Sequence, residues 1–145
     1  MLVRKIDHIN IRTARFADTV KFYVDVLGMK NARMPGSPED RPASFIEDGS
    51  GAFAIHLIPV DPADPAADYD RMMRSRRGLE GMPPPSFHGS GAVDHIAFEC
   101  DDYAQMIERL KATNTPHAEG YVEQINLRQI FVVDPNGITL ELNFK

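Results

Sequence analysis

The sequence predicts an α+β fold in which a β-α-β-β-β module occurs twice, the two copies together forming a cupped mixed sheet. The first observation is that "IDHIN" at 6–10 returns as "VDHIA" at 93–97. The second is that an aromatic residue, eight positions after each histidine, opens a stretch with apolar residues at helical spacing. The third is that extended segments joined by a turn follow each predicted helix, with "DGSG" at 48–51 and "DPNG" at 134–137.

These repeats divide the chain into a first module at 1–60, an insert at 61–90 and a second module at 91–145. Gly28 and Asn114 stand where the helices should end, because both residues tolerate the left-handed conformation of a C-terminal cap. The helices themselves are predicted from two apolar sets, Phe16, Val20, Tyr23, Val24 and Leu27 in the first module and Tyr103, Ile107 and Leu110 in the second.

The insert has no counterpart in the repeat and is long for a connection within a compact fold. We expect a short helix at about 69–76 and an extended run at Pro83–Pro85. Its "RMMRSRR" segment could cover a pocket as a lid that attracts an anionic substrate. A solvated basic helix face explains the same segment, and we favour that interpretation.

Composition points to a small partner molecule. The 145 residues carry a net charge of -5, with a pI near 5.5, which argues against a nucleic-acid or anionic-membrane surface. No apolar run reaches the roughly 20 residues of a membrane span, and the first residues lack the apolar core of a signal peptide. The single cysteine, Cys100, agrees with a reducing compartment, so we expect a cytoplasmic protein.

Alternation within four predicted strands separates apolar from polar faces. His8, His56, His95 and Glu141 all fall on polar faces, opposite four apolar sets: Ile9 and Ile11; Phe53, Ile55 and Leu57; Ile96, Phe98 and Cys100; and Ile138, Leu140, Leu142 and Phe144. A lone histidine in a strand is more often a surface residue than a ligand. Four candidates at equivalent places of a repeat favour a site instead. The polar faces also carry candidate substrate-orienting residues, namely Asn10, Arg12, Glu99 and Asn143.

Three imidazoles and one carboxylate form a suitable ligand set for one divalent ion such as Zn, Ni, Fe or Mn. The four side chains can share an ion only if the strands curl so that their polar faces line one cleft. The 38 residues between His56 and His95 are long enough for the site to form within one chain or across two copies, and we expect a homodimer.

The segments "DHINI", "FYVDVLGM", "DHIAFEC" and "FVVDPNGITLEL" resemble the vicinal oxygen chelate superfamily, which includes glyoxalase I, methylmalonyl-CoA epimerase, extradiol dioxygenases, fosfomycin-modifying transferases and bleomycin-binding proteins. The resemblance covers the chain except the insert at about 61–90. It implies a cupped sheet that holds a divalent metal at His8, His56, His95 and Glu141.

The filled fourth position favours the glyoxalase and epimerase branch, whose metal stabilises an enediolate during isomerase or lyase chemistry. Glu141 would then be both a ligand and the candidate base. Glyoxalases usually have Glu or Gln where this chain has His56. We assign His56 to the catalytic site, and its role decides between the branches of the superfamily.

Two alternatives stay open. An extradiol dioxygenase would use His8, His95 and Glu141, with His56 as a nearby acid-base group or a bystander. Phe131 stands where dioxygenases have a tyrosine, and we assign it to substrate binding. A fosfomycin-type thiol transferase would use a similar triad. The other alternative is a non-catalytic antibiotic-binding protein, although such proteins generally lack the ligand set.

Overall fold

The computed structural model describes residues 6–69, 88–90, 93 and 95–145. Its first module contains β1 (Ile9–Thr13), α1 (Phe16–Lys21), the π-helical turn η1 (Phe22–Val26), β2 (Lys30–Arg33), β3 (Ser44–Glu47) and β4 (Ile55–Pro59). After the short helix α2 (Pro65–Tyr69), the second module contains β5 (Ile96–Glu99), α3 (Tyr103–Ala112), β6 (His117–Val122), the 3-10 turn η4 (Glu123–Ile125), β7 (Leu127–Val133) and β8 (Thr139–Phe144). Among the described residues, no helix is long and apolar enough to cross a membrane.

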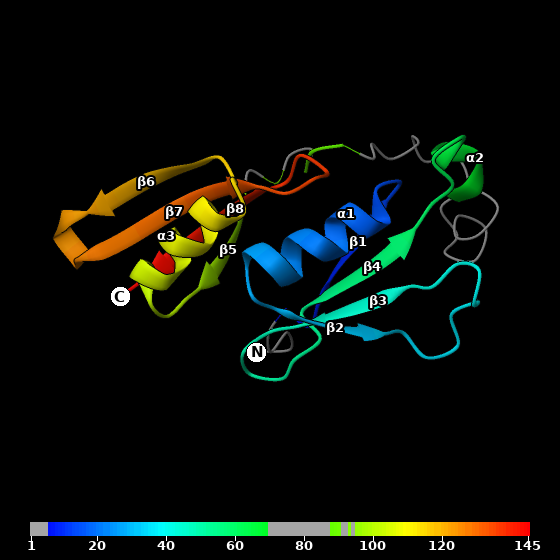
Figure 1. The fold of residues 1–145 in the computed structure, drawn as a ribbon, viewed down its shortest axis with the longest axis horizontal. Coiled ribbons are helices and arrows are strands. Elements are labelled where there is room, and N and C mark those ends of the chain that lie inside the picture. Colours follow the sequence, from blue (N-terminus) through cyan, green and yellow to red (C-terminus); the bar gives the residue numbers. More distant parts are fainter. Residues whose placement is uncertain (1–5, 70–87, 91–92, 94) are drawn as a thin grey trace, which may run out of the picture.

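Each module forms its own four-stranded mixed sheet, with strand orders β1-β4-β3-β2 and β5-β8-β7-β6 (Figure 1). β1 runs parallel to β4 and β5 runs parallel to β8, while the remaining pairs are antiparallel. The predicted fold class and the repeat are therefore confirmed. Within the described part of the chain the strands form two separate sheets, and β1 and β5 each lie at the edge of one of them. The strands fall within 1–60 and 91–145, and the exact module boundaries stay a prediction.

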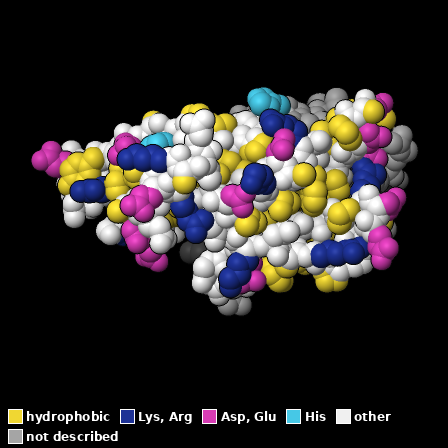
Figure 2. All heavy atoms as spheres, viewed as in Figure 1, with side chains coloured by type: hydrophobic (Ala, Val, Ile, Leu, Met, Phe, Trp, Pro, Cys, Tyr) yellow, Lys and Arg dark blue, Asp and Glu magenta, His cyan; other side chains and the backbone are white. Residues whose placement is uncertain are grey.

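The helix of the first module changes pitch, and this alters which side chains reach the core. The π-helical turn η1 follows α1 directly, and it buries Tyr23 completely. The predicted apolar set is thereby divided, because Phe16, Val20 and Val24 border a groove beside β2 and β3. Figure 2 shows apolar side chains gathered over this part of the surface.

The two modules are joined by a buried polar cluster, which we call the latch and define as Thr13, Thr19, Tyr23, Asp134 and Asn136. The "DPNG" segment forms the predicted turn, in which Gly137 N donates to Asp134 O (3.0 Å). Asn136 accepts from the Thr13 hydroxyl (2.5 Å) and donates to Thr19 Oγ1 (3.1 Å). The Tyr23 hydroxyl donates to Asp134 Oδ2 (3.2 Å). Burial raises the pKa of Tyr23 and the Asp134 carboxylate raises it further, so this hydroxyl stays a donor.

Helix packing joins the modules a second time, where η1 meets α3 near the centre of Figure 1. Arg109 of α3 donates from Nη1 to the backbone oxygen of Asp25 (3.3 Å). Its guanidinium lies against Gly28, which caps η1 in the predicted left-handed conformation (φ 70°). A Cβ at Gly28 would stand 3.1 Å from Arg109 Cζ. Asn114 is likewise left-handed (φ 51°), as predicted.

We expect Gly28→Ala to lower the free energy of unfolding by about 1–2 kcal/mol, because an alanine is strained in the left-handed region. Its Cβ would also displace the Arg109 guanidinium. Gly49→Ala is the matched control, since nothing lies within 4 Å of a Cβ placed there. Urea unfolding of both variants measures the difference. An equal loss in the two variants would contradict this role of Gly28.

The described part of the insert contains the short helix α2, which ends where the predicted 69–76 helix begins. α2 spans Pro65–Tyr69 because Asp64 accepts from Ala67 N (3.1 Å) and Pro65 suits the first helical position. Buried Asp68 anchors this helix to Arg41 through Nη1 (3.0 Å). The rest of the predicted 69–76 helix, the Pro83–Pro85 run and the basic lid segment lie outside the described residues.

Candidate metal site

The first pair of predicted ligands lies on the polar face of the first sheet. His56 points away from the buried neighbours Ile55 and Leu57, and it is in register with Asn10 of β1. His8 immediately precedes β1, and its ring stacks on the His56 ring with centroids 3.8 Å apart and an interplanar angle of 15°. The alternation of β1 and β4 therefore brings two imidazoles together.

A carboxylate orients one of these imidazoles. His8 Nδ1 lies 2.7 Å from Asp7 Oδ2, and with a proton on Nδ1 the opposite nitrogen Nε2 keeps its lone pair for a metal. Burial lowers the pKa of His56, and the neighbouring His8 lowers it further against the opposing effect of Asp7. Neutral imidazole is the form that binds metal ions, so the pair is chemically suited to that role.

The second pair of predicted ligands lies on the sheet of the second module. His95 Nε2 is 3.5 Å from Glu141 Oε2. The other carboxylate oxygen, Oε1, accepts from Asn143 Nδ2 (2.8 Å). Asn143 in turn accepts from Gln129 Nε2 (3.0 Å), so a short hydrogen-bonded chain holds Glu141 from behind. Such support is typical of carboxylate ligands.

The predicted substrate-binding residues divide between the two sheets. Asn10 lies in register with His56, and Arg12 follows it on β1 as a half-buried side chain. Phe131 lies in register with Glu141, and Asn143 donates a hydrogen bond to the Glu141 carboxylate. Glu99 lies in register with Asn143, and its exposed carboxylate is 3.6 Å from Lys145 Nζ.

The two ligand pairs do not meet within one chain. Across residues 6–69, 88–90, 93 and 95–145, no group of three or more His, Cys, Asp or Glu side chains is arranged to hold a metal ion. His8 and His56 belong to one sheet, whereas His95 and Glu141 belong to the other. Each module therefore presents half of the predicted ligand set.

The structure corrects the predicted position of Phe53 and adds Phe45 to the candidate site. Phe53 does not join the apolar face of β4, because the strand begins only at Ile55. Its ring instead stacks on Phe45 (4.7 Å between centroids), which lies on the His56 side of the sheet. Phe45 could have been identified as a site residue from the sequence, because alternation in "SFIE" separates it from Ile46 and because it corresponds to Phe131 in the repeat.

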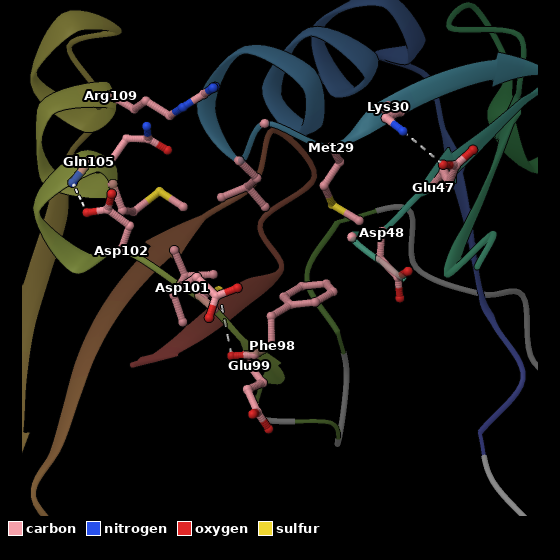
Figure 3. A pocket seen from close by; sticks show the side chains of 16 residues that line it. Met29, Lys30, Glu47, Asp48, Phe98, Glu99, Asp101, Asp102, Gln105 and Arg109 are labelled. Carbon is pink, nitrogen blue, oxygen red and sulfur yellow. Dashed lines mark hydrogen bonds and ion pairs between the residues drawn. The ribbon is translucent and has the colours of Figure 1, made fainter. Parts of the chain in front are cut away.

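A cavity of about 460 Å³ lies between the modules, and none of the predicted metal ligands lines it (Figure 3). One wall carries Met29, Lys30 and Glu47 and the opposite wall carries Gln105 and Arg109, as Figure 3 shows. Cys100 also lines this cavity, and burial raises the pKa of its thiol, which disfavours the nucleophilic thiolate.

Comparisons with known proteins agree with this architecture. The family model of the Glyoxalase/Bleomycin resistance protein/Dioxygenase superfamily matches residues 5–142. A lactoylglutathione lyase of Salmonella typhimurium is 26% identical over 137 residues, covering 93% of this chain and 88% of that protein.

Two solved structures share the fold at low identity. One is a putative glyoxalase family protein from Bacillus anthracis (TM-score 0.64, 16% identity, 100% of this chain and 98% of that chain). The other is a fosfomycin resistance protein from Listeria monocytogenes (TM-score 0.61, 16% identity, 99% and 95%). At these identities the likeness concerns the fold alone. Because the family model spans nearly the whole sequence, this chain belongs to the Glyoxalase/Bleomycin resistance protein/Dioxygenase superfamily.

Proposed function

We propose that this chain is a divalent-metal-dependent enzyme of the glyoxalase type, acting as an isomerase or lyase on a small oxygenated substrate. The observation that carries the proposal is the matched position of His56 and Glu141. Each lies on the strand that pairs in parallel with an edge strand, and each has a phenylalanine in register on its other side. Both sheets thus present a candidate ligand at the same place of the repeat, each beside a second candidate, His8 or His95.

We propose further that a second copy completes the ligand set, so that His8 and His56 of one copy face His95 and Glu141 of the other. Among the described strands, β1 and β5 lie at sheet edges, which supports this arrangement because an edge strand is available to pair with another chain. Just before these strands, Ile6 is 82% exposed and Val93 is 55% exposed. A dimer would cover both side chains.

The latch supports the same conclusion. It ties the β7–β8 turn to β1, α1 and η1 through buried hydrogen bonds. Bringing the two ligand pairs together within one chain would require the modules to move apart at these contacts, leaving buried polar groups unpaired. Addition of a second copy leaves the latch intact.

The donor set fits a borderline divalent ion such as Zn, Ni, Fe or Mn, which would supply a Lewis acid for negative charge on substrate oxygens. Glu141 is the candidate base, taking a proton from a hydroxyl-bearing carbon and returning it to the neighbouring carbonyl carbon. Asn143 positions Glu141 by donating to Oε1, which leaves Oε2 on the His95 side. His56 stands where glyoxalases usually have a carboxylate or amide, so the substrate need not be a glutathione derivative such as the one in the name of the Salmonella typhimurium lactoylglutathione lyase.

Metal analysis with an activity assay tests this proposal. We expect the purified protein to hold zinc, nickel or manganese at about one ion per chain, and to isomerise hemithioacetals of 2-oxoaldehydes without consuming oxygen. Replacing His8 by Ala should lower the affinity for the metal ion. The loss should exceed the roughly 10–100-fold that is typical when a residue supporting a metal ligand is removed. Bound iron with oxygen uptake on catechols would favour the dioxygenase alternative. Unchanged metal content in both His56→Ala and Glu141→Ala would exclude these residues as ligands.

A further inference from the structure

The polar faces of the two sheets carry the same aromatic arrangement beside the candidate ligands. Phe45 of β3 is in register with His56, and Phe131 of β7 is in register with Glu141. The next strand places a small residue beside each ring, Ala32 beside Phe45 and Ala118 beside Phe131. Each half of the proposed site therefore offers a ligand, then a phenyl ring, then an alanine.

In the first module this arrangement extends into a row of three neighbouring rings, in which Phe45 stacks on Phe53 and is tilted by 52° to His56. The Phe45 centroid lies 4.6 Å from that of His56 and 4.7 Å from that of Phe53, whose ring is nearly parallel to Phe45 (17°). Phe53 is 44% exposed, although it sits beside a polar face where a hydrophilic residue would be better hydrated. This row of rings thus runs from a candidate metal ligand to an accessible apolar ring.

The second module has a comparable apolar wall. Phe131 lies against Gly120 of β6, with its Cε2 3.5 Å from the position a Cβ on Gly120 would take. The missing side chain leaves room for the ring along the strand. With the two half-sites facing each other, phenyl groups would flank the reacting atoms on both sides.

We infer that the substrate carries a flat apolar group, such as an aryl ring, next to its two chelating oxygens. This inference rests on the proposed function, because the oxygens must first be held by a metal at His56 and Glu141. A substrate so placed has its remaining atoms over Phe45 and Phe53 or against Phe131. Aromatic faces bind flat apolar groups through offset stacking and area burial.

The test compares two chelators that differ only beside the chelating oxygens. We expect zinc-loaded protein to bind benzohydroxamate about tenfold or more tighter than acetohydroxamate, after correction for their affinities for free zinc. Phe53→Ala should reduce that ratio to about two- or threefold without changing zinc content or acetohydroxamate binding. The control Ile125→Ala removes another exposed apolar side chain (65%) from η4 in the second module and should leave the ratio unchanged.

The outcomes separate this inference from the proposed function. If both hydroxamates bind equally after correction, the aryl preference is wrong while the metal site stands. If Phe53→Ala changes the dimer's elution volume and not the ratio, Phe53 belongs to the interface between copies and the inference is overturned. If the protein holds none of zinc, nickel and manganese, or if the metal-loaded protein binds neither hydroxamate, the proposed function fails and the substrate inference fails with it.

Discussion

Mixed dimers assembled from two inactive variants are expected to regain about half of the wild-type activity per dimer. One variant carries His8→Ala with His56→Ala, and the other carries His95→Ala with Glu141→Ala. If each site takes one ligand pair from each copy, the mixed dimer contains one site with all four ligands and one with none. Co-expression with two different affinity tags, followed by purification through both, isolates the mixed species. Activity and bound metal are then measured per dimer.

Each variant alone should hold little metal, because every site in its own dimer lacks one ligand pair. The control is a doubly tagged dimer in which both copies carry all four substitutions, and it should stay inactive. If the variants still dimerise but the mixed dimers regain neither activity nor bound metal, both ligand pairs of a site come from one chain. That result would contradict the shared site and require the modules to rearrange at the latch.

Asp134→Ala is expected to lower the free energy of unfolding by about 3 kcal/mol. The Asp134 carboxylate is buried and accepts hydrogen bonds from Asn136 N (2.8 Å), Ile138 N (2.9 Å) and the Tyr23 hydroxyl (3.2 Å). The substitution leaves these donors without an acceptor, each in a region closed to water. Urea unfolding measures the loss.

Asp48→Ala is the matched control within the repeat. Asp48 begins the corresponding turn of the first module and accepts from Ser50 N (2.9 Å) and Ala52 N (3.1 Å), the same two positions in the turn. Its surroundings are more exposed, so we expect a loss of only about 1 kcal/mol. The difference between the two variants measures what burial between the modules adds. Equal losses would show that the latch contributes no more than the turn itself.

Short-range patterns identified most of the fold in advance. The returning "DHI" segment, the helical spacing and the turn residues all describe interactions between residues close in sequence, which is why the repeat, the caps at Gly28 and Asn114 and both turns agree with the structure. Alternation succeeded where a strand continued through the pattern, as at Glu141. It failed at Phe53, because β4 begins two residues later and the preceding loop turns the ring to the other side.

Long-range contacts could not be read from such patterns. Thr13, Thr19 and Asn136 are ordinary strand, helix and turn residues until the modules pack and bury them together. The support of Glu141 by Asn143 and Gln129 depends on the register of β7 against β8, which is established only by strand pairing.

The sequence by itself determined the duplicated module, the polar placement of the four candidate ligands and the family to which they point. Only the tertiary structure decided how those ligands are grouped, because grouping depends on which sheet edges remain open and on how the latch holds the modules. Backbone periodicity assigns a side chain to a face of its own strand, and the packing of distant segments decides which faces can meet.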